Sequence, residues 1–435
     1  MIRKLAFPGW LLFCAVALIT GGGRGYAQLD FEQKPIEYSE RPTADSVARL
    51  QAGLDAGAVR LTFDSRHGYL PAVLEQLGIS TTSQMLVFSK TSFQLRRISS
   101  QRPRAVYFND TTYVGWVQGG DVVEVATVDP DQGAVFYTLE QNETAKPVFV
   151  RDRGECLSCH ASSRTQNVPG LLVRSVFADR SGQPQFGSGT FTIDHRSPLD
   201  KRWGGWYVTG QHGQMRHMGN AFSEDRARPD VIDREQGANV NDLRELVDVD
   251  PYLQTTSDIV ALMVLEHQTQ MHNFIIRANY EARSAAYQDE MMNAALGRPA
   301  DYQSESSIRR IETAAEKLVE YLLFSSEFPL ASPVRGAPAF TEQFAAQGPR
   351  DSRGRSLRDF DLQTRMFRYP CSYLIYSDAF THLPATVQKV VRKRLREILV
   401  ENVADPKFVH LSAADRQAIA EILRETQPGL LAAVE

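Results

Sequence analysis

The hydrophobic pattern of the chain changes near residue 240. Before it, from residue 104 to about 150, short segments such as "TTYVGWVQ" and "DVVEVATV" alternate apolar and polar positions. Turn-forming pairs such as "ND" and "GG" separate these segments, which predicts an antiparallel meander. The segments 170–179 and 189–194 predict a further hairpin, and "RWGGWYVTG" at 202–210 predicts one more strand.

After residue 240 the apolar positions recur at helical spacing. A long helix is predicted between Ser257 or Asp258 and the stop at Gly297, and a second over 304–324. The last helices are predicted at 384–400 and 412–425, and two short N-terminal helices at 43–54 and 71–77. The expected fold class is α+β, with an antiparallel β-rich central region followed by a mainly α-helical C-terminal half. The expected divisions are 28–103 (an N-terminal arm and short helices), 104–240 (β-rich) and 241–435 (helical).

The first 27 residues have the features of an export signal. Arg3 and Lys4 precede an apolar run over residues 5–19, and small residues before Gln28 predict cleavage there. The run is short for a membrane-spanning helix, and an uncleaved anchor is the alternative. We therefore expect an exported protein, periplasmic or secreted, that is not integral to the membrane once the signal is removed.

Charge and cysteine content exclude some classes of function. The formal charge of −4 becomes about −7 when three basic residues leave with the signal, which argues against a nucleic-acid partner. The mature chain keeps Cys156, Cys159 and Cys371. Because exported proteins built on disulfides have more cysteines, in even number, we expect these to serve chemistry. Cys371 lies in an apolar segment and is expected to be a buried free thiol.

The segment "GECLSCH" at 154–160 places two thiols and an imidazole within five positions. Such a pattern can hold a metal, cycle between dithiol and disulfide, or attach a haem covalently. A structural zinc site requires further ligands at suitable spacing, and no second CxxC is present. A redox dithiol prefers the start of a helix in a βαβ unit, whereas strands flank this motif. Covalent haem attachment uses all three side chains, and export is the setting in which it takes place in bacteria.

With this motif in an exported chain, the protein resembles a c-type cytochrome with a single haem. The resemblance implies that Cys156 and Cys159 bind one haem c through thioethers and that His160 is an axial ligand of its iron. It covers the motif and the export signal only. The strands before the motif differ from the helical pattern of small cytochromes c, so the resemblance carries the attachment chemistry and not the fold.

A second axial ligand is expected from the loop "QHGQMRHMGN" at 211–220. It offers His217, Met218, His212 and Met215, with glycines that let the backbone approach a flat cofactor. His217 and Met218 rank first. Ordinary packing is the alternative reading of all four, because His and Met are also common as satisfied residues.

Other side chains are weaker candidates for haem contacts. In the long helix Met263, His267 and Met271 share one face, and Met366 lies in a later loop, but core packing explains each of them. Arginines also surround the motif and could bind haem propionates, which are carboxylates. They are Arg151, Arg153, Arg164 and Arg174.

The expected function is electron transfer by an iron that cycles between Fe(II) and Fe(III), with a redox protein or a small-molecule electron donor or acceptor as partner. Because the mature chain is long for a protein that only carries electrons, two alternative functions stay open. One is a haem oxidoreductase with an open sixth iron position. The other is a haem-bearing module for sensing or for binding a partner.

Overall fold

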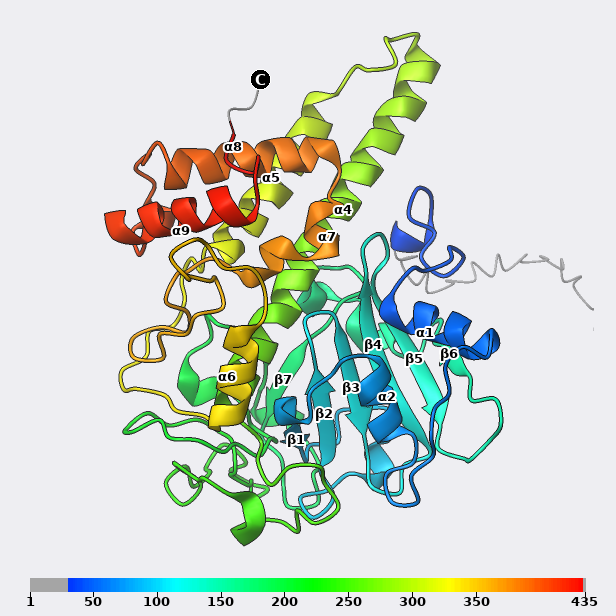
Figure 1. Cartoon of the computed structure of the whole chain (residues 1–435), viewed down its shortest axis with the longest axis vertical. Helices are drawn as coiled ribbons and strands as arrows, with labels where there is room; N and C mark the ends of the chain where they lie inside the picture. Colours follow the sequence, from blue (N-terminus) through cyan, green and yellow to red (C-terminus); the bar gives the residue numbers. More distant parts are fainter. Residues whose placement is uncertain (1–29, 433–435) are drawn as a thin grey trace, which may run out of the picture.

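The computed structural model describes residues 30–432, so the predicted export signal lies outside the described residues. Within them, an antiparallel sheet is followed by a mainly helical C-terminal half (Figure 1). The predicted α+β class is therefore confirmed.

The main sheet is a meander in which each strand pairs with the next along the chain. Its strands are rich in β-branched and aromatic residues, which pack well on a pleated surface. A short first strand, which the sequence pattern did not predict, pairs Met85 with Val106. The strands are β1 (Met85–Val87), β2 (Arg104–Phe108), β3 (Thr112–Trp116), β4 (Val122–Asp129), β5 (Gly133–Glu140) and β6 (Phe149–Arg151).

Both faces of the sheet contribute to a hydrophobic core. The face with Tyr107 and Val135 packs with the N-terminal helices (Figure 1). Asp45, rather than Thr43, caps the first of them, because its carboxylate accepts two backbone N–H groups of the first turn. These helices are α1 (Ser46–Asp55) and α2 (Leu70–Gln76).

The opposite face, with Val106 and Phe136, joins a larger core that includes the C-terminal helices. The central helix of this core, α4 (Ile259–Leu296), is capped by Asp258 and ends at Gly297, as predicted. Every side chain from 259 to 276 is buried, which a helix shows when neighbours surround it.

The remaining helices pack around α4. Figure 1 shows α5 beside α4 as the second arm of a helical hairpin, with α8 and α9 stacked across it. The predicted helices at 304–324, 384–400 and 412–425 are confirmed within a few residues. The elements are α3 (Leu157–His160), α5 (Glu305–Leu322), α6 (Pro338–Ala346), α7 (Asp378–Thr381), α8 (Ala385–Leu399) and α9 (Ala413–Thr426).

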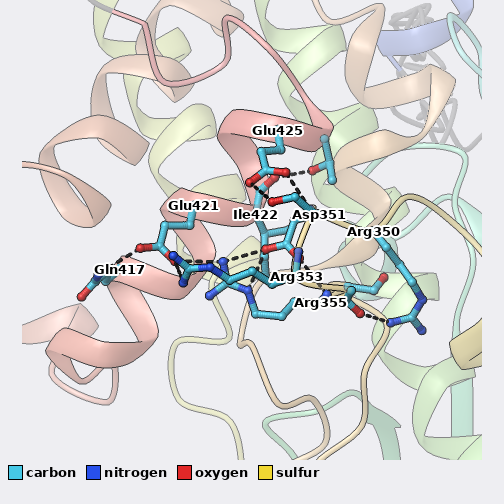
Figure 2. A network of polar contacts seen from close by, with 12 residues as sticks. Arg350, Asp351, Arg353, Arg355, Gln417, Glu421, Ile422 and Glu425 are labelled. Carbon is cyan, nitrogen blue, oxygen red and sulfur yellow. Dashed lines mark hydrogen bonds and ion pairs between the residues drawn. The ribbon is translucent and has the colours of Figure 1, made fainter.

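Charged side chains attach α9 to the loop that follows α6 (Figure 2). Glu421 of α9 pairs with Arg353 at 2.9 Å and with Arg355 at 2.8 Å. Arg355 also pairs with Asp351 at 2.6 Å, and Glu425 accepts the backbone N–H of residue 352 at 2.7 Å. Each guanidinium and carboxylate of this group therefore has an oppositely charged or hydrogen-bonding partner.

The predicted strand at 202–210 is wrong. Trp203 and Gly205 have positive φ angles of 62° and 84°, which a strand does not accommodate, and Trp206 makes an isolated bridge to Val87. The predicted hairpin does form, as β7 (Val173–Val176) paired with β8 (Thr190–Ile193). Between residues 30 and 432, no helix combines the length and the apolar character needed to cross a membrane.

Candidate functional site

The motif residues lie on one turn of helix, α3, a few residues after strand β6. The N–H groups of Cys159 and His160 both donate to the carbonyl of Cys156, at 3.2 and 3.0 Å. Asp152 fixes the start of the turn, because its carboxylate accepts the N–H of Cys156 at 3.0 Å. On such a turn, residues three apart lie on the same side, so the two thiols share one side of the segment.

Two reciprocal hydrogen bonds join His160 to Gly170. Nδ1 of His160 donates to the Gly170 carbonyl at 2.9 Å, and the Gly170 N–H donates to the His160 carbonyl at 2.8 Å. Because a carbonyl oxygen only accepts, Nδ1 carries the ring proton and Nε2 keeps its lone pair. Histidines that ligate metals usually donate their other ring N–H in this way. The ring of Phe136 packs on the imidazole at a centroid distance of 4.8 Å.

Helix α4 fixes the backbone segment whose Gly170 carbonyl orients His160. Oδ1 of Asn273 accepts the N–H of Leu171 at 2.9 Å, and Nδ2 donates to the Leu171 carbonyl at 2.7 Å. A Cβ atom on Gly170 would lie 2.3 Å from Oδ1 of Asn273, so this position requires glycine. Sequence reasoning missed Gly170 and Asn273; the signals were "PG" shortly after the motif and an asparagine within an apolar helix.

Burial sets the protonation of the motif side chains. It lowers the pKa of His160, against the raising effect of the Gly170 carbonyl, so the ring is neutral at pH 7. Burial, together with the carboxylates of Asp152 and Glu124, raises the pKa of the Cys156 thiol to about 12. Redox-active dithiols depend on a lowered thiol pKa, so Cys156 lacks the property that defines them.

Apolar side chains remain exposed near the motif. Val150 of β6 is 57% exposed although it lies opposite Thr138, on the sheet face that also carries Phe136. Phe186, just before β8, is 51% exposed, and Cys159 is exposed as well. A free imidazole lone pair, two thiols and uncovered apolar surface are the features that a covalently attached haem requires. The residues present therefore fit such a group.

The two histidines of the loop 211–220 are buried together, with ring centroids 4.7 Å apart. His212 uses both ring nitrogens, since Nδ1 donates to the Met215 carbonyl at 2.7 Å and Nε2 accepts the N–H of Asn239 at 3.1 Å. In His217, Nδ1 accepts the N–H of Gly219 at 3.0 Å, which places the proton of the neutral ring on Nε2.

The two methionines of that loop are also buried. Sδ of Met218 accepts the hydroxyl of Ser175 at 3.6 Å, and Met215 packs in the core shared with α4. Within the described residues, no hydrogen bond or aromatic contact joins the four candidates to His160. A second ligand from this loop stays a prediction.

The weaker candidates also have structural partners. His267 of α4 bonds to His195 through Nδ1 and to Ser372 through Nε2, both at 2.8 Å. Met263, Met271 and Met366 are buried in the core. Cys371 is a buried free thiol, as predicted.

The four flanking arginines differ in their surroundings. Arg151 donates to two backbone carbonyls, at 2.8 and 2.6 Å, and its charge lies over the ring of Tyr38. Arg153 and Arg164 are exposed, and Arg174 is half-buried. Both terminal nitrogens of Arg151 are therefore engaged, although its buried Nε has no hydrogen-bond partner.

Comparison with models of known protein families, with curated proteins and with solved structures finds no match.

Proposed function

We propose that this is an exported protein that carries one haem c, bound through Cys156 and Cys159, with His160 as an axial ligand of the iron. The observation that carries the proposal is the pair of hydrogen bonds between His160 and Gly170, which leaves Nε2 of His160 free to bind a metal. In attachment, each thiol adds across a vinyl group, sulfur to one carbon and hydrogen to the other, so no atom is lost.

The role we propose is one-electron transfer, which the haem iron supplies by cycling between Fe(II) and Fe(III). The protein residues would hold and orient the group and limit the access of water to it. Because Cys159, Phe186 and Val150 are exposed, the attachment edge lies at the surface, where a redox partner can approach it.

A haem oxidoreductase is the second candidate, and a specific observation favours it. The lone pair of His212 and the sulfur of Met218 both accept hydrogen bonds, and the neutral ring of His217 carries its proton on Nε2. If these bonds persist in the loaded protein, His212, Met218 and His217 would not bind the iron, and a small molecule could take the sixth position unless Met215 does.

Haem staining of a denaturing gel tests the attachment. The full-length protein, expressed with a haem-attachment system, should keep the stain after boiling in detergent. The double variant Cys156→Ala/Cys159→Ala should lose it completely. The matched control Cys371→Ala should keep it, because that thiol is buried in the core. A wild-type band without stain contradicts the proposal.

Optical spectra then separate the two roles. A methionine-to-iron absorption band that is lost in Met218→Leu or Met215→Leu supports the carrier. A high-spin spectrum that shifts when a small ligand is added supports the oxidoreductase.

A further inference from the structure

Arg174 on β7 is held in a fixed position. Its Nη2 donates to the Thr190 hydroxyl at 2.7 Å, and its guanidinium lies 5.1 Å from the centre of the Phe186 ring. The indole N–H of Trp206 donates to the Arg174 carbonyl at 2.8 Å, which fixes the backbone as well. An arginine with this many neutral contacts is placed before any anion arrives.

This guanidinium has no acidic partner. Among residues 30–432, neither Arg174 nor its neighbour Arg164 forms an ion pair, and Nε of Arg174 is buried without any hydrogen-bond partner. Partial burial, and next the positive charge of Arg164, lower the pKa of Arg174. A half-buried cation without a counter-charge is costly in free energy, so the site favours an anion.

Arg180, on the adjacent loop, has the same kind of aromatic contact but also a carboxylate partner, and its side chain is more exposed than that of Arg174. Its guanidinium lies over the ring of Phe222 at 4.5 Å, as that of Arg174 lies over Phe186. In addition it pairs with Glu224 at 2.8 Å. The missing element at Arg174 is therefore the carboxylate.

The unpaired site belongs to the surroundings of the motif. Arg174 follows Leu171 by three residues on the same backbone segment, and Leu171 adjoins the Gly170 carbonyl that accepts the Nδ1–H of His160. The main chain gives a second link, because Gln270 of α4 donates to the Arg164 carbonyl at 3.1 Å and Asn273, one turn later, holds Leu171. The exposed ring of Phe186 adds apolar surface beside the cation.

We propose that Arg174, assisted by Arg164, binds a propionate carboxylate of the haem. This inference rests on the proposed function and adds the residue that fixes the acidic edge of the group. A guanidinium suits the task because it can offer two parallel N–H donors to one carboxylate. Its positive charge would also favour the ferrous state and the ionised propionate.

The test measures the reduction potential of the haem-loaded protein as a function of pH. Arg174→Gln should lower the potential, because a positive charge next to the haem is lost. It should also move the pH-dependent part of the curve to higher pH, because the propionate loses the cation that favours its ionised form. Arg174→Lys should lie between Arg174→Gln and wild type. The matched control Arg180→Gln should leave the curve unchanged.

Four outcomes overturn the inference. A haem-loaded Arg174→Gln protein with an unchanged curve shows that no propionate lies there, while the attachment proposal survives. A wild-type protein without haem overturns both. Binding of inorganic phosphate to the loaded wild-type protein that Arg174→Gln abolishes shows that the site takes a free anion. If Arg174→Gln does not accumulate, Arg174→Lys and the exposed Arg164→Gln should both shift the curve in the same direction, and unchanged curves in both overturn the inference.

Discussion

The middle of α4 and the surroundings of the motif both contain buried or half-buried polar side chains. In α4 most of these groups bond within the protein, whereas around the motif several remain unpaired. In the middle of α4, the buried polar side chains of one segment bond to other parts of the protein, although Oε2 of Glu266 and Nδ1 of His272 lack partners. These residues are Glu266, His267, Gln268, Gln270, His272 and Asn273. Around the motif, Nε2 of His160 has its lone pair free, Arg174 lacks a counter-charge and Phe186 is exposed.

The difference distinguishes polar groups that stabilise the fold from polar groups that can still bind a ligand. A buried polar group is tolerated when its partners are inside the protein, and the atoms engaged in those bonds are not available to a ligand. The α4 segment therefore ties the sheet, the motif loop and the C-terminal helices together. The motif region has an unpaired guanidinium and exposed apolar surface, which the proposed haem would use.

The largest expected effect is in the α4 region. Arg202→Met would leave Glu266 buried without its charged partner, which should lower the free energy of unfolding by about 3–5 kcal/mol. Arg353→Met removes one exposed guanidinium of the α9 group and should cost about 1 kcal/mol or less. Urea unfolding measures both, and equal losses would contradict the distinction.

Asn273→Leu connects the two regions. It leaves the N–H and C=O groups of Leu171 without their partners, which should cost about 3 kcal/mol. Because Leu171 adjoins the carbonyl that orients His160, the axial-ligand absorption of the loaded protein should change too. Asn293→Leu is the control, since Asn293 is a buried α4 residue that bonds only to a distant turn. It should destabilise the protein without changing the spectrum.

Glu327→Gln should remove a pH dependence from the core. Burial raises the pKa of Glu327 from 4.5 to about 7, so the folded protein binds this proton more tightly than the unfolded chain. Its contribution to stability is complete below about pH 4.5 and is lost as the pH rises towards 7. Between pH 4 and pH 8, the stability of the wild type relative to Glu327→Gln should fall by roughly 3 kcal/mol. If the stability difference between the two proteins does not change with pH, the pKa of Glu327 is not raised in the folded state.

The smallest effect is expected beside the motif. Phe186→Ser removes an exposed ring whose main contact is the Arg174 guanidinium, and it should change the stability of the haem-free protein by about 0.5 kcal/mol or less. In the loaded protein the same change should expose the haem edge, which solvent-perturbation absorption spectroscopy would detect. A large loss of stability in the haem-free protein would place Phe186 in the core instead.

The elements with strong periodicity could be predicted from the sequence. The meander from 104 to 151 and the helices α4, α5, α8 and α9 lie where alternation and helical spacing put them. The strand predicted at 202–210 does not form. Its aromatic residues fit a strand, but Trp203 and Gly205 adopt positive φ angles. Its neighbours decide this conformation, since the hydroxyl oxygen of Ser175 accepts the N–H of Gly204 at 2.7 Å.

The candidate site divides in the same way. Local sequence determined that two thiols and an imidazole share one helical turn, because residues three and four apart meet there. Only the tertiary structure brought Gly170 and Asn273 to the imidazole, fixed its tautomer and left Arg174 without a carboxylate. These properties depend on residues up to about a hundred positions away, whose meeting follows from the packing of α4 on the sheet and is written in no local pattern.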